Sequence, residues 1–287
     1  MSEGDHILGI CFSGNALYYA LRHVQAGSSL RYIGKADFNF SVEEAFAACD
    51  EAPCSNINTT IQRIASNWSV NTVRIVSFPR FECWTSLPKL AYADSTEREA
   101  HLSILARGKE RNRLETTWFE TSNRDYRFLS IRDHTMVEML NACTRSISNT
   151  EYCADFEVGL EWMRHSGSRG SFLAVGCSEN TVTISSFLLG KLRAATRLNF
   201  RHPDDLAYSW RQNEVHLSWM KGYHEDILMY GSGCSDILNR LKPMWDQNAE
   251  VRRINTLGDM KIEAEESTYS FPLEQAFPAV MMALKSD

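Results

Sequence analysis

Two stretches of the chain share one pattern of hydrophobic and polar positions: an apolar run, a tight polar turn, and a second run that alternates. The first covers residues 7–21 and the second covers residues 172–193. Apolar runs that reverse at a small polar turn are typical of a β-hairpin. We therefore predict a hairpin near the start of each half of the chain, and with them two similar lobes that face each other.

The rest of the chain alternates between strand-like and helix-like patterns. Residues 30–40 predict a third strand, and Ser41 with Glu44 forms a capping box that predicts a short helix. The order of elements favours an α/β fold over a β-sandwich. Further helices are predicted at 58–68, 95–110, 134–145, 157–165, 203–221, 235–245 and 273–284, and further strands at 72–77, 116–120, 126–131, 151–156, 192–200, 226–230 and 250–254.

The character of the sequence changes between residues 79 and 148, where polar and charged stretches dominate. We predict an inserted subdomain there. The first lobe is then expected to cover residues 1–165, completed by a returning C-terminal helix at 273–287. The second lobe is expected to cover residues 166–272.

Composition limits the class of partner. The chain has 287 residues, of which 44% are hydrophobic and 23% charged, as in a soluble globular protein. Its net charge of −6, without a block of consecutive basic residues, argues against nucleic acid. No stretch approaches the ~20 apolar residues of a membrane span, and the N-terminus does not resemble a signal peptide. We expect a cytoplasmic protein whose link to any membrane goes through a partner.

Five stretches, taken in order, resemble the actin-like superfamily of sugar kinases, Hsp70 and actin. The resemblance is strongest to the PilM-type proteins of type IV pilus assembly and their relatives in type II secretion. It implies a two-lobed, actin-like (ribonuclease H-like) α/β fold with an inserted subdomain in the first lobe. The stretches are ILGICFSGNALYYAL, YCADFEVGLEWMRH, FLAVGCSENTVTISSFLLGKL, ILMYGSGCSDIL and FPLEQAFPAVMMALKSD.

In this superfamily, two hairpin turns and a glycine-rich turn before a helix hold a nucleotide. Backbone N–H groups of the hairpin turns bind phosphates, and small residues in the third turn leave room for the nucleobase. The resemblance thus implies three sets of candidate cofactor-binding residues. They are Ser13, Gly14 and Asn15; Ser178, Glu179 and Asn180; and Gly231, Ser232 and Gly233.

The sequence departs from the family at two positions on which its chemistry depends. Cys11 and Gly176 stand where the family has the aspartates that organise Mg²⁺. Because a thiol and a glycine do not hold a hard cation, we predict no catalytic and no metal-binding residue. Glu179 is the one carboxylate in either turn, and it is either a shifted substitute or an exposed turn residue.

Three functions remain open. The first is a non-catalytic, PilM-like scaffold of a pilus assembly or type II secretion-like machine. The resemblance implies that it docks an N-terminal peptide of an inner-membrane protein in a groove of the first lobe. The second is an ATPase or small-molecule kinase with an altered site, and the third is a sensor that binds ATP without hydrolysis. The lost carboxylates favour the scaffold, which requires neither a cofactor nor enzymatic activity.

Overall fold

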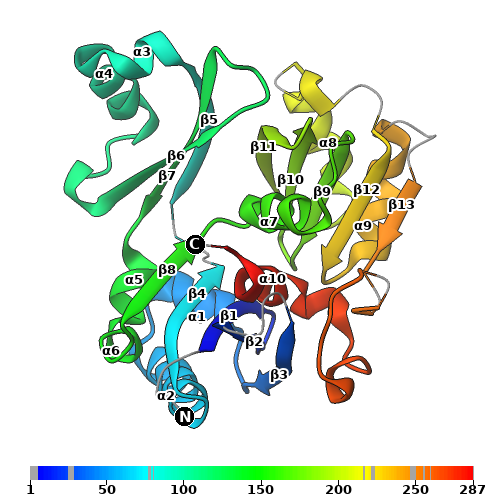
Figure 1. Ribbon diagram of the computed structural model, residues 1–287. Coiled ribbons are helices and arrows are strands. Elements are labelled where there is room, and N and C mark those ends of the chain that lie inside the picture. The colour runs from blue at the N-terminus through cyan, green and yellow to red at the C-terminus, as the bar shows by residue number, and fades with distance from the viewer. Residues whose placement is uncertain are drawn as a thin grey trace.

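The computed structural model contains two five-stranded sheets and one three-stranded sheet. Figure 1 shows the larger sheets side by side, with helices α7 and α10 between them and the small sheet above the first. The structure describes residues 6–24, 29–76, 79, 81–215, 217–220, 224–245, 250–254, 256–258 and 260–286. Residues 77, 216 and 221, which end or interrupt predicted elements, lie outside these ranges.

The first sheet has the order β3-β2-β1-β4-β8. Its first three strands form an antiparallel meander, and the other two join in parallel. Ser13 pairs with Ala16, which confirms the first hairpin and leaves a two-residue turn whose Gly14 has a φ of 58°. Glycine adopts this left-handed conformation without strain. The strands are β1 (His6–Ser13), β2 (Ala16–His23), β3 (Leu30–Asp37), β4 (Val70–Val76) and β8 (Asn149–Cys153).

Helices cover one face of the first sheet. The hydroxyl of Ser41 accepts a hydrogen bond from the backbone N–H of Glu44 at 3.3 Å, so the predicted cap of α1 is confirmed. The helix predicted at 134–145 is instead two shorter helices that meet at Leu140, whose buried side chain packs in the same core. The helices are α1 (Val42–Ala48), α2 (Glu51–Asn67), α5 (Thr135–Met139) and α6 (Asn141–Thr144).

The second sheet repeats this plan in the order β11-β10-β9-β12-β13. Three antiparallel strands are again followed by two parallel ones, and the predicted hairpin at 172–193 is confirmed. Helices α8 (Asp205–Asn213) and α9 (Cys234–Leu241) pack on one face. The strands are β9 (Phe172–Cys177), β10 (Thr181–Leu188), β11 (Lys191–Asn199), β12 (Asp226–Gly231) and β13 (Glu250–Arg253).

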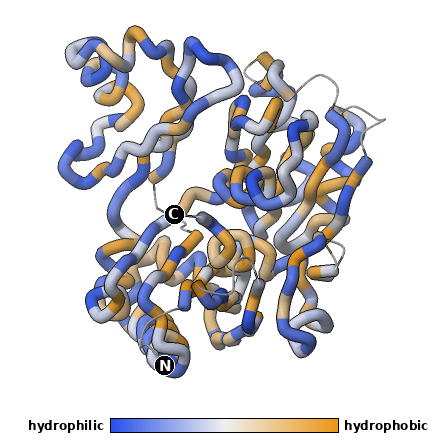
Figure 2. Tube along the Cα trace, in the orientation of Figure 1, coloured by the Kyte–Doolittle hydropathy of each residue, from blue (hydrophilic) through white to orange (hydrophobic). Residues whose placement is uncertain are grey.

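The remaining face of each large sheet packs on α7 (Phe156–Ser166) and α10 (Leu273–Leu284), which share one buried core. Figure 2 shows hydrophobic residues concentrated along α10 at the centre of the molecule. A Cβ on Gly9 of β1 would lie 2.0 Å from the carbonyl oxygen of Ala279, so only glycine permits this close approach. In the part of the chain that is described, every helix is too short or too polar to cross a membrane.

The small sheet has the order β5-β7-β6 and lies within the predicted insertion. Helices α3 and α4 cover one face. On the other, Trp84, Phe119 and Phe128 surround Phe156 of α7, with ring centroids 5.0, 5.0 and 5.2 Å away. The sheet is therefore anchored on the helix between the lobes. Its elements are β5 (Glu82–Pro88), α3 (Lys89–Ala93), α4 (Ser95–Leu105), β6 (Leu114–Glu120) and β7 (Tyr126–Asp133).

Short 3₁₀ helices complete the described structure. They are η2 (Arg111–Arg113), η3 (Ser218–Met220), η4 (Lys242–Met244) and η5 (Glu266–Thr268). The segment that contains η5 returns the chain from the second lobe to the first, since Glu265 N–H donates to the carbonyl of Leu30 at 2.9 Å. Two segments, α7 and this return, thus connect the lobes.

Candidate functional site

The two hairpin turns meet where the lobes face each other. A Cβ on Gly14 would lie 2.9 Å from Oε1 of Glu179, so the first turn closely approaches the second. Ser13, Ser178 and Gly231, one residue from each candidate turn, line the same small cavity. The structure therefore places the three turns around one point.

Four of the other candidate residues make structural contacts and do not line this cavity. The amide of Asn15 donates to a backbone carbonyl after β3 at 3.2 Å, and the carbonyl of Asn180 accepts from the backbone after β11 at 2.9 Å. Ser232 N–H donates to the carbonyl of Cys177 at 2.9 Å. Gly233 is the N-cap of α9, with a φ of 71°.

The cavity between the turns is small. It holds about 30 Å³, which is room for one or two water molecules and not for a nucleotide. Cys11, Tyr230 and Gln275 fill the surrounding space. The thiol of Cys11 donates to the carbonyl of Gln275 at 3.4 Å, and the hydroxyl of Tyr230 donates to the carbonyl of Asp155 at 3.3 Å.

The two positions that carry metal-organising carboxylates in the actin-like pattern have a different role here. Burial raises the pKa of Cys11 to about 12, so its thiol is neutral at physiological pH. A Cβ on Gly176 would lie 2.8 Å from Oδ2 of Asp155 and 2.9 Å from the ring of Tyr230. An aspartate has no room at this position, because its neighbours already occupy the space.

Asp155 is a site residue that the motif comparison missed. It follows β8 and precedes α7, and burial raises its pKa although Thr183 and Arg197 oppose the shift. A signal was present in the sequence, since the carboxyl ends of parallel strands are where α/β folds place ligands. The residue stands outside the three turns, so their motifs do not point to it.

Glu43 of α1 is the second missed carboxylate. Its pKa is raised to about 7, chiefly by burial and then by the charge of Glu179, while Arg197 opposes the shift and Asp155 adds to it. Three carboxylates from distant segments therefore interact across the cleft. No sequence spacing connects α1 with the other two residues, so pattern analysis could not group them.

Arg197 of β11 supplies the positive charge among these acids. Its Nη2 lies 2.8 Å from Oε2 of Glu82, whose side chain is only 1% exposed, and its guanidinium lies 4.9 Å from the ring centre of Trp84. Both partners belong to β5 of the small sheet. The ion pair thus fastens the inserted sheet to the second lobe beside the cleft.

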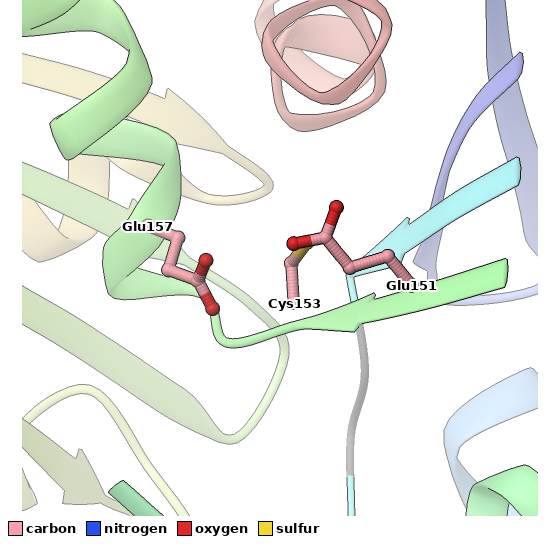
Figure 3. Close-up of side chains that lie close together, drawn as sticks. All are labelled: Glu151, Cys153 and Glu157. Carbon is pink, nitrogen blue, oxygen red and sulfur yellow. The ribbon is translucent and has the colours of Figure 1, made fainter. Parts of the chain in front are cut away.

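The described residues contain one group with the composition of a metal site, shown in Figure 3. Ligand atoms of Glu151, Cys153 and Glu157 lie within 4.8 Å of one another. Nζ of Lys285 lies 3.2 Å from Oε2 of Glu157 and 3.5 Å from Sγ of Cys153, and it also forms an ion pair with Glu151. An internal ammonium therefore occupies the place that a cation would take, and it ties the end of α10 to β8 and α7.

No protein-family profile and no curated protein sequence match this chain. Solved structures do match. The structure of the PilM–PilN type IV pilus biogenesis complex is 10% identical with a TM-score of 0.62, covering 99% of this chain and 98% of that chain. A Bacteroides thetaiotaomicron protein of unknown function with an actin-like ATPase fold is 13% identical with a TM-score of 0.51, covering 87% and 91%. The cytoplasmic domain of Vibrio cholerae EpsL, an inner-membrane component of the type II secretion system, is 10% identical with a TM-score of 0.47, covering 89% and 92%.

At these identities the likeness shows the fold alone. This chain has the actin-like fold, and the predicted two-lobed α/β architecture is confirmed.

Proposed function

We propose that this chain is a non-catalytic actin-like scaffold that docks a protein partner of a pilus assembly or type II secretion-like machine. The observation that carries the proposal is the small size of the cavity between the turns. Only about 30 Å³ remains between the turns, where Cys11 and Gly176 replace the carboxylates that would organise Mg²⁺. The similarity to PilM in the PilM–PilN complex, over nearly the whole chain, supports the class of partner.

A groove of the first lobe is the docking surface we propose. A cavity of about 420 Å³ lies between the insertion and α5, lined by residues that include Lys109, Arg113, Asp133 and Thr135. Charges of both signs suit an extended peptide that binds by main-chain hydrogen bonds and a few side chains. The ion pair of Arg113 with Glu138 at 3.5 Å is exposed on both sides, so displacing it costs little.

The test is site-specific crosslinking in the native cells, followed by titration of the captured segment. A photoreactive residue at Thr135 should crosslink an inner-membrane protein through its cytoplasmic N-terminal segment, whereas one at Tyr208, which is 70% exposed in the second lobe, should not. A synthetic peptide of that segment should bind wild type at least tenfold more tightly than the Lys109→Glu, Arg113→Glu double variant. Equal affinity for both proteins would exclude this groove.

An altered ATPase or kinase remains the second candidate, because Glu43, Asp155 and Glu179 converge on the cleft. Titration calorimetry with ATP and ADP, each with and without Mg²⁺, separates the functions. The scaffold gives no binding heat at protein concentrations in the tens of micromolar. Binding that strengthens with Mg²⁺, with turnover that disappears in Glu179→Ala, would establish the enzyme instead. ATP binding without turnover would identify a nucleotide sensor.

A further inference from the structure

A further cavity lies at the C-terminal end of α7, and it shares no lining residue with the cleft between the turns. It holds about 320 Å³, which falls within the range of small-molecule sites. Its walls come from α7, from β9, β12 and β13 of the second sheet, and from the segment that returns to the first lobe. Figure 1 shows α7 crossing in front of this sheet.

One wall of this cavity is apolar and well packed. Trp162, Phe172, Leu228 and Met260 are each at most 8% exposed. The ring of Phe172 stacks on Phe187 with centroids 4.7 Å apart, so its position is fixed from behind. A planar apolar body could lie against this wall without rearranging it, which keeps the entropic cost of binding low.

The lining of the cavity also carries positive charge. Arg252 and Lys261 are both exposed, and among the described lining residues Asp226 is the single carboxylate. These described residues place two cations against one anion, on a chain whose net charge is −6. Asp226 contacts Arg252 through one nitrogen at 3.2 Å, so the guanidinium keeps other donors for a ligand.

Lys261 is held at this rim in an unusual conformation. Its φ of 54° is left-handed, which is uncommon for a residue with a long side chain. Its backbone N–H donates to the carbonyl of Gly258 at 3.0 Å, and its backbone also forms a hydrogen bond with the ring of His165. Strained backbone that the surroundings hold in place is frequent at ligand sites.

We propose that this cavity binds a small aromatic carboxylate, with its carboxylate between Arg252 and Lys261 and its ring against Trp162 and Phe172. Both connections between the lobes, α7 and the return segment, contribute to the lining. An occupant would therefore fasten them to the second sheet. The proposal is independent of the docking function.

Three probes test it: indole-3-acetate, its neutral analogue indole-3-acetamide, and inorganic phosphate. Each is titrated into the full chain and followed by calorimetry and by the indole N–H signals in NMR. Indole-3-acetate should bind at one site and shift the signal of Trp162. The neutral amide and phosphate should each bind at least tenfold more weakly, because the amide lacks the negative charge and phosphate lacks the aromatic ring.

Two sets of variants assign the site. Arg252→Gln with Lys261→Asn removes both cations, and asparagine tolerates the left-handed backbone. Lys191→Asn with Arg193→Gln makes the same charge change on β11 and is the matched control. The Arg252→Gln, Lys261→Asn variant should bind indole-3-acetate at least tenfold more weakly than wild type, and the control variant should bind it as tightly as wild type. Ser168→Trp, which fills the cavity from its rim, should abolish binding.

Several results would overturn the proposal. They are absence of saturable indole-3-acetate binding to wild type, equal affinity for the amide or phosphate, and equal losses in the pocket and control variants. Thermal unfolding of each variant establishes that it is folded before its affinity is compared. If the double variant does not fold, Ser168→Trp decides the question, because binding that survives a filled cavity is elsewhere.

Discussion

Glu43 offers a direct test of the electrostatics in the closed cleft. Its pKa rises from 4.5 in the unfolded chain to about 7 in the folded protein, chiefly because α1 buries the carboxyl. Between these values the folded protein binds more protons than the unfolded chain, so stability falls as pH rises through this window. At about 1.4 kcal/mol for each pH unit, ionised Glu43 costs the folded state roughly 3 kcal/mol at pH 8.

Glu43→Gln removes this cost while keeping the size of the side chain. Urea unfolding at pH 8 should show the variant about 3 kcal/mol more stable than wild type, whereas at pH 4.5 the two should agree within about 0.5 kcal/mol. The control is Glu44→Gln, which changes an exposed neighbour on the same helix. If Glu43→Gln gains no more at pH 8 than the control does, the carboxyl is not held in a buried acidic cleft.

Two further substitutions test other parts of the structure by urea unfolding at pH 7. Lys285→Met leaves Glu157, which is 5% exposed, without its cation, and should lower the free energy of unfolding by about 3–5 kcal/mol. Adding Glu157→Gln in a double variant should restore most of this loss. A loss below about 1 kcal/mol in Lys285→Met would contradict the assigned ion pairs. Gly176→Ala places a Cβ 2.8 Å from Asp155 Oδ2 and should lower the free energy of unfolding by about 1–3 kcal/mol. An unchanged free energy of unfolding would mean that the cleft has room for the added methyl group.

Much of the fold could be predicted because it follows from local patterns. The hairpins around Gly14 and at residues 172–193 combine alternation with a turn residue that permits the reversal. The cap at Ser41 is likewise a local hydrogen bond. Such features depend on residues within a few positions of one another, which a single sequence displays.

Features that depend on tertiary contacts were missed. Strand β5 has the sequence ECWTSLP, which neither alternates regularly nor forms an apolar run, and it is stabilised by pairing with β7. The helix breaks at Leu140, whose buried side chain packs in the same core as α2, although the helical pattern of the sequence continues through this residue. In the site, Glu43 and Asp155 meet Glu179 only because two lobes fold together, and the place of Lys285 beside Glu157 is equally nonlocal.

The close contact between β1 and α10 also has a consequence for biosynthesis. Cys11 and its partner Gln275 are separated by 264 positions in the chain. At about 5–20 residues per second, the first strands leave the ribosome roughly 15–50 s before the helix that covers them. During that interval the apolar face of the first sheet lacks its native cover. A nascent chain of this protein is therefore expected to engage chaperones until α10 has been synthesised and packed against Gly9.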